Sequence, residues 1–158
     1  MAGDARRGKL ESNHANAAVN QILMIDDDDD HRELFGLAAQ TLGLQASVVT
    51  FKSGPQVLQH LQLQLSPPVL ILVDVKMPGM DGPSTVRNLR AVPALELVPI
   101  VMISTSDNLG DQRNAQLAGA NSYVLKPLGH NSWLDTLSSL VSYWSTCDVR
   151  WRTRQIRY

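Results

Sequence analysis

Five short apolar runs alternate with five segments of helical periodicity along most of this chain. The first run, residues 22–25, contains no polar residue and ends in acids, which is typical of a strand buried on both faces of a parallel sheet. Strands joined by helices lie parallel, and right-handed crossovers place the helices on both faces of the sheet. The pattern therefore predicts an α/β fold, a (βα)₅ doubly wound parallel five-stranded sheet.

The expected elements follow one another without long gaps. Strands are expected at 22–25, 46–51, 69–73, 100–103 and 122–125, and helical patterns at 34–42, 55–65, 86–90, 111–117 and 133–143. In open parallel sheets, ligands bind beyond the carboxyl ends of the strands. Polar residues at those ends are the candidates for chemistry.

Three carboxylates, a hydroxyl and an ammonium group stand at the predicted strand ends: Asp26, Asp27, Asp74, Ser104 and Lys126. Two like charges about 4 Å apart repel by roughly 4 kcal/mol at an effective dielectric constant near 20, so three clustered carboxylates need a cation. Mg²⁺ prefers such oxygen ligands. A carboxylate beside Mg²⁺ and a lysine can attack phosphorus, which predicts an aspartyl phosphate.

Four segments together resemble the receiver domain of bacterial two-component response regulators: residues 22–28, 70–82, 99–104 and 118–127. They occur in the family's order and spacing, and the resemblance covers about residues 21–143. It implies the flavodoxin-like receiver fold, in a stand-alone protein of the chemotaxis-regulator or phytochrome-associated type.

The resemblance also implies roles for single residues. Asp74 matches the phosphoacceptor, Asp26 and Asp27 the acidic pair that holds Mg²⁺, and Lys76 the position whose backbone carbonyl also binds the metal. As the phosphoacceptor, Asp74 belongs to this metal site as well.

Three further positions match residues that respond to the phosphoryl group. Ser104 matches the hydroxyl residue that turns onto it, Lys126 the lysine that pairs with it, and Tyr123 the aromatic switch residue. The Lys126–Pro127 bond matches one that is usually cis in the family. Lys76 and Thr105 depart from common family residues, and we expect them, together with Ser106, to alter the lifetime of the phosphoryl group.

The function implied is a phosphorylation-dependent switch, not an enzyme with a separate substrate. A histidine kinase or phosphotransfer protein would supply the phosphoryl group to Asp74, and an unknown protein would read the result. Three alternatives stay open: a phosphorelay intermediate, a phosphate-independent adaptor and a phosphatase. The haloacid-dehalogenase type of phosphatase is disfavoured, because it has a second Asp where this chain has Lys76.

Charge is distributed unevenly over the 158 residues. Residues 15–143 hold seven Lys or Arg and twelve Asp or Glu, a net charge of −5, whereas residues 144–158 hold four Arg and one Asp, a net charge of +3. We interpret 1–20 as a flexible leader, 21–143 as the receiver domain and 144–158 as a basic-aromatic tail. Packing of the tail on the body, a partner or a second copy in a homodimer is favoured over nucleic-acid binding.

No apolar stretch approaches the ~18 residues of a membrane helix, so we expect a cytoplasmic protein. Asp28, Asp29 and Asp30 are interpreted as a solvated acidic turn near a helix N-terminus. A calcium loop is rejected, because the required Gly and Glu positions hold His31 and Leu37. The scattered histidines His31, His60 and His130 are expected at the surface.

Overall fold

The computed structural model describes residues 21–45 and 47–147. Its strands are β1 (Ile22–Ile25), β2 (Val48–Phe51), β3 (Leu70–Asp74), β4 (Ile100–Ser104) and β5 (Ser122–Leu125). Its α-helices are α1 (Asp29–Thr41), α2 (Gly54–Gln62), α3 (Gly82–Arg90), α4 (Leu109–Ala118) and α5 (His130–Thr146), with a 3₁₀ turn at Pro93–Leu95. The predicted alternation of strands and helices is confirmed.

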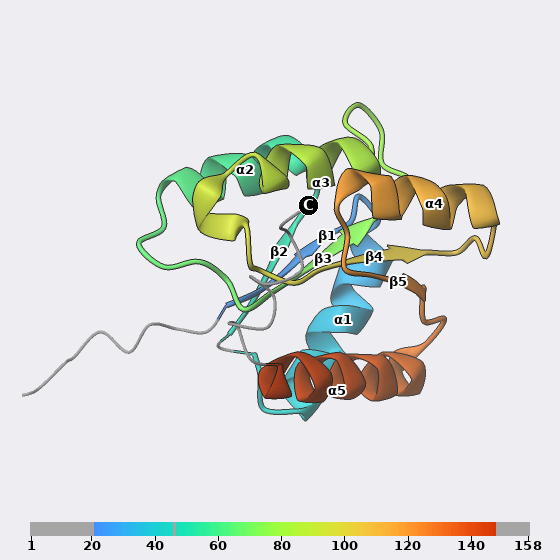
Figure 1. Ribbon diagram of the computed structural model, residues 1–158. Coiled ribbons are helices and arrows are strands. Elements are labelled where there is room, and N and C mark those ends of the chain that lie inside the picture. The colour runs from blue at the N-terminus through green and yellow to red at the C-terminus, as the bar shows by residue number, and fades with distance from the viewer. Residues whose placement is uncertain (1–20, 46, 148–158) are drawn as a thin grey trace, which may run out of the picture.

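All five strands belong to one parallel sheet in the order β2-β1-β3-β4-β5. The order reverses between β1 and β3, which is the topological switch point where doubly wound folds bind ligands. Helices α2, α3 and α4 cover one face of the sheet, and α1 and α5 cover the other (Figure 1). The (βα)₅ doubly wound fold is as predicted.

Alternation of side chains along the central strands fills two cores. In β1, Leu23 and Ile25 face α2 and α3, whereas Ile22 and Met24 face α1 and α5. Both sets are almost wholly buried. An all-apolar strand is the consequence of having a helix layer on each side.

Helix ends explain most differences from the predicted bounds. Asp28 caps α1 by accepting hydrogen bonds from the backbone N–H groups of Asp30 and His31, so this helix begins five residues before its first apolar position. Asn108 caps α4 in the same way, through the N–H of Gly110. Periodicity marks the buried face of a helix, whereas capping side chains decide its first turn.

The last helix, α5, continues to Thr146, so the first three residues assigned to the basic-aromatic tail are helical. Residues 148–158 of that tail and the leader 1–20 lie outside the described residues. The expectation of a cis Lys126–Pro127 bond is wrong, since this peptide is trans, the isomer that X–Pro bonds favour intrinsically. Among the described residues, no helix has both the length and the apolarity to cross a bilayer.

Candidate functional site

The site lies at the carboxyl edge of the sheet, around the ends of β1 and β3. Asp26 directly follows β1, and its backbone N–H continues the sheet by donating to the carbonyl of Phe51. Asp74 is the last residue of β3. Because β1 and β3 are neighbouring parallel strands in register, both carboxyl groups reach the same space.

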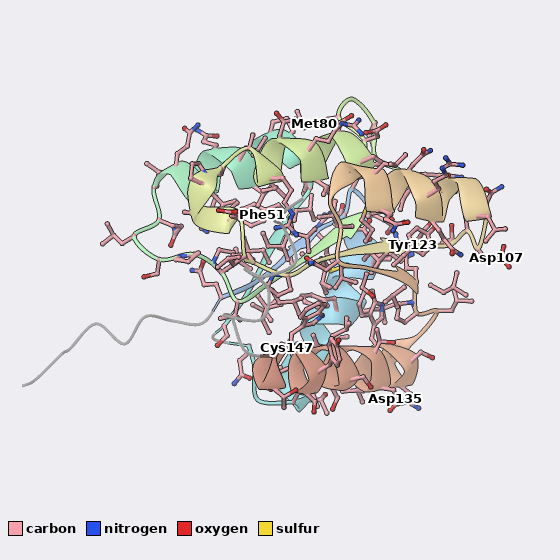
Figure 2. The ribbon with its side chains drawn as sticks, in the orientation of Figure 1. Phe51, Met80, Asp107, Tyr123, Asp135 and Cys147 are labelled. Atoms are coloured by element: carbon pink, nitrogen blue, oxygen red, sulfur yellow. The ribbon has the colours of Figure 1, made fainter. Side chains whose placement is uncertain are left out.

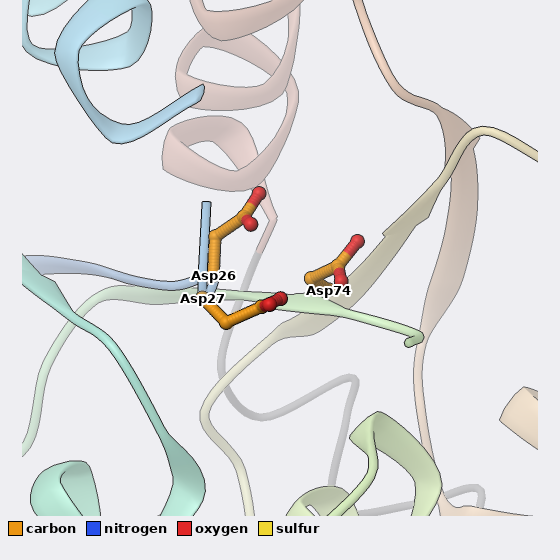
Figure 3. Close-up of side chains that lie close together, drawn as sticks. All are labelled: Asp26, Asp27 and Asp74. Carbon is orange, nitrogen blue, oxygen red and sulfur yellow. The ribbon is translucent and has the colours of Figure 1, made fainter. Parts of the chain in front are cut away.

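Oxygen atoms of Asp26, Asp27 and Asp74 lie within 4.8 Å of one another. Figure 3 shows the three carboxylates directed toward a common space beyond the strand ends. Asp26 is fully buried and Asp74 is 5% exposed, whereas Asp27 is open to solvent. Three oxygen ligands of this kind, with one side open, form a donor set that suits a hard divalent cation.

Lys126 joins two of these carboxylates. It follows β5, and its backbone N–H donates to the carbonyl of Ser104 at 2.7 Å, which aims the side chain back over the strand ends. Its Nζ lies 2.7 Å from Oδ1 of Asp74 and 2.8 Å from Oδ2 of Asp26. The ammonium group is therefore bound by both buried acids.

The pKa values of Asp74 and Lys126 are both raised, for different reasons. Burial is the largest cause of the raised pKa of Asp74, to which the negative charges of Asp26 and Asp27 add, whereas Lys126 lowers that pKa in part. Burial by itself lowers the pKa of Lys126, but its interactions with Asp26 and Asp74 outweigh burial and raise that pKa. The two buried acids thus favour binding a proton or a cation at this place.

Ser104 and Tyr123 both contact the loop between β4 and α4. The hydroxyl oxygen of Ser104 accepts a hydrogen bond from the N–H of Ser106 at 3.1 Å. The Tyr123 hydroxyl donates to the Ser106 carbonyl at 2.7 Å. Figure 2 shows Tyr123 on the α4 side of β5. Both predicted switch residues are thus linked to the same loop residue.

Lys76 extends into solvent in the loop after β3, where it lines a hollow with Asp81 and Asp111. The next helix packs tightly against this loop, because a Cβ atom on Gly82 would lie 2.2 Å from the carbonyl oxygen of Asp74. Glycine at position 82 is what allows α3 to begin so close to the phosphoacceptor candidate.

His31 is a site residue that the sequence analysis missed. Its Nδ1 lies 3.1 Å from Nζ of Lys126 and 3.5 Å from Oδ2 of Asp26, and its side chain is 25% exposed. The predicted surface position of His31 holds only in part, because its ring is partly covered and contacts Lys126 and Asp26. His31 lies five residues after Asp26, in the first turn of the helix that follows this strand end.

Arg32 was also missed. Its guanidinium donates to the backbone carbonyl of Asp26 and pairs with the carboxylate of Asp29, and the residue is 8% exposed. The acids of the Asp run therefore divide by role. Asp26 and Asp27 face the cluster, Asp28 caps α1, and Asp29 binds Arg32.

The family model of the response regulator receiver domain matches residues 22–138. The chain belongs to this family. Members act as phosphoacceptors in two-component signalling, which agrees with an Asp, a Lys and an acidic pair meeting at one edge of the sheet.

Curated relatives differ in how much of their length this chain covers. It is 28% identical over 127 residues to the probable methanogenesis regulatory protein FilR2 of Methanothrix harundinacea, covering 78% of this chain and 82% of that protein. It is 34% identical over 108 residues to the response regulator PleD of Caulobacter vibrioides, covering 68% of this chain but only 23% of PleD. The family thus includes both small proteins and domains of larger ones.

Solved structures agree on the fold. The phosphorylated cyanobacterial phytochrome response regulator RcpA superposes with a TM-score of 0.72 at 24% identity, over 82% of this chain and 96% of that one. The response regulator Rcp1, solved in a Mn²⁺-bound form, gives a TM-score of 0.67 at 24% identity, over 82% and 97% of the two chains. The predicted flavodoxin-like receiver fold is confirmed.

Proposed function

We propose that this chain is a single-domain response regulator that accepts a phosphoryl group on Asp74 from a histidine kinase or a phosphotransfer protein. The observation that carries the proposal is the buried Asp74 carboxylate, held 2.7 Å from Lys126 beside two further carboxylates. A structural carboxylate at a strand end needs neither the additional acids nor the ammonium group.

The chemistry is a displacement at phosphorus. A carboxylate oxygen of Asp74 forms the new O–P bond while the P–N bond to the donor's imidazole breaks, and the imidazole leaves with the electron pair of that bond. Lys126 supplies positive charge beside the reacting oxygens as negative charge develops on the phosphoryl group. Water later cleaves the acyl phosphate and returns Asp74 to its carboxylate form.

Mg²⁺ is the proposed cofactor. The residues that would hold it are Asp26, Asp27 and Asp74, with the backbone carbonyl of Lys76 as a further ligand. The fit rests on the three clustered oxygen donors and on the raised pKa of Asp74, both of which favour a cation at this place. When bound, Mg²⁺ neutralises charge on the carboxylates and on the incoming phosphoryl oxygens.

Ser104 and Tyr123 are the proposed link between the site and a partner surface. Because both are hydrogen-bonded to Ser106, movement of Ser104 toward a phosphoryl group also disturbs the loop that holds Tyr123. The adjoining surface of α4, β5 and the loop before α5 exposes four leucines: Leu109, Leu117, Leu125 and Leu128. We propose that phosphorylation shifts the population of states of this surface and its affinity for a downstream protein or a second copy of the chain.

Labelling with radioactive acetyl phosphate in the presence of Mg²⁺ tests the phosphoacceptor. We expect the wild type and the exposed-site control Asp107→Asn to incorporate about one phosphoryl group per chain, and Asp74→Ala to incorporate none. Equal labelling of Asp74→Ala would disprove the assignment of Asp74. An unlabelled wild type would instead favour the phosphate-independent adaptor, and rapid loss of label to a phosphotransfer histidine would favour a relay intermediate.

A further inference from the structure

Three acceptors surround the ammonium group of Lys126. Its Nζ lies 2.7 Å from Oδ1 of Asp74, 2.8 Å from Oδ2 of Asp26 and 3.1 Å from Nδ1 of His31. Two of these contacts are ion pairs with carboxylates, and the third is a hydrogen bond with an imidazole nitrogen. Since the Lys126 side chain is only 4% exposed, these contacts determine where its charge lies.

His31 contributes a ring nitrogen to this group. An ammonium group has no lone pair, so in this contact Nδ1 of His31 is the acceptor. The same Nδ1 is farther from the neighbouring carboxylates, at 3.5 Å from Asp26 and 3.7 Å from Asp28.

The first turn of α1 fixes His31 in this position. Asp28 accepts the backbone N–H of His31 at 3.3 Å, and the next residue, Arg32, donates to the carbonyl of Asp26. Hydrogen bonds at His31 and at the next residue, Arg32, therefore hold the start of α1 in place. His31 approaches Lys126 from α1, whereas the two carboxylates approach it from β1 and β3.

We propose that His31 is a positioning residue for phosphoryl transfer: it accepts a hydrogen bond from Lys126 and holds the ammonium group in place beside Asp74. The inference rests on the proposed transfer to Asp74. A free lysine side chain loses conformational entropy when it is ordered, and this loss costs free energy. Fixing Lys126 before the phosphoryl group arrives removes this cost from the transfer step, as expected of a preorganised site.

Two substitutions separate hydrogen bonding from packing. His31→Asn keeps an acceptor oxygen near the place of Nδ1, whereas His31→Leu keeps similar bulk and removes the acceptor. In unphosphorylated protein without metal, exchange of the Lys126 ammonium hydrogens with water is measured by ¹⁵N NMR, with Lys126→Arg to assign the signal. We expect exchange about fivefold faster in His31→Leu, since one hydrogen bond is lost, and within about twofold of wild type in His31→Asn.

The second measurement is the rate of Asp74 labelling by acetyl phosphate at saturating Mg²⁺. We expect His31→Leu to be slower by about fivefold, His31→Asn to be close to wild type, and Mg²⁺ affinity to be the same in all three proteins. A purely structural role would instead lower Mg²⁺ affinity or affect both variants alike.

The inference about His31 would be overturned if exchange of the Lys126 ammonium hydrogens were unchanged in His31→Leu. It would also be overturned if exchange and Asp74 labelling were as impaired in His31→Asn as in His31→Leu. The two proposals fail separately. Absence of label on wild-type Asp74 would reject the proposed function, while the exchange measurement would still decide whether His31 fixes Lys126.

Discussion

At the scale of the residue, Asp74 is the group whose ionisation opposes folding. Burial raises its pKa above the ordinary 3.8, so the folded state binds its proton more tightly than the unfolded state does. Stability is therefore lost as the pH rises from 3.8 through the raised pKa, and the deficit persists at neutral pH. We expect Asp74→Asn, measured without metal at pH 7, to raise Tm by about 2–4 °C, the shift that about 1 kcal/mol produces in a chain of this size. Thermal unfolding over a pH series should show this gain shrinking as the pH falls, whereas the exposed-site control Asp107→Asn should show none. A gain that grows on acidification would contradict the sign of the pKa shift.

At the scale of the element, the start of α3 is placed by its contact with the end of β3. A Cβ on Gly82 would meet the Asp74 carbonyl oxygen at 2.2 Å and the Val75 Cα at 2.8 Å, and these backbone atoms cannot turn away. We expect Gly82→Ala to lower the free energy of unfolding by about 1–3 kcal/mol, the usual cost of overpacking, and to weaken Mg²⁺ binding by displacing Asp74. Gly36→Ala is the matched control, because Gly36 lies inside α1 with nothing within 4 Å of its Cβ position. That variant should be neutral or up to about 1 kcal/mol more stable. Urea unfolding measures both, and equal behaviour would show that the contact at Gly82 is unimportant.

At the scale of the whole molecule, we expect the acidic cluster to couple Mg²⁺ binding to folding, since its carboxylates come from the ends of two strands that meet only in the folded sheet. A ligand that binds only the folded state at 100 times its Kd stabilises it by about 2.7 kcal/mol. For a chain of this size we expect Mg²⁺ at that concentration to raise Tm by about 5–10 °C. Asp27→Asn removes an exposed carboxylate of the proposed metal site with little effect on packing, so its Tm without metal should match wild type while its response to Mg²⁺ falls. Scanning calorimetry across a Mg²⁺ titration measures both effects. An undiminished response in Asp27→Asn would exclude Asp27 from the metal site.

Local sequence determined the elements and most of the site. An all-apolar run such as Ile22–Ile25 specifies a strand buried on both faces, and helical periodicity between such runs specifies parallel strands. Parallel strands end at one edge of a sheet, so residues that follow them directly converge without further information. For this reason Asp26, Asp74 and Lys126 could be predicted as neighbours from their positions alone.

Only the tertiary structure decided which side chains outside the strand ends complete the site. His31 is 95 residues from Lys126 in sequence, and their contact depends on where Asp28 starts α1 and on how that helix packs on the sheet beside α5. The local sequence pattern specifies a helix and its apolar face. The orientation of that helix on the sheet depends on how the helices and the sheet pack together. The strand ends were therefore determined by the sequence itself, whereas the surroundings of Lys126 were determined by long-range packing.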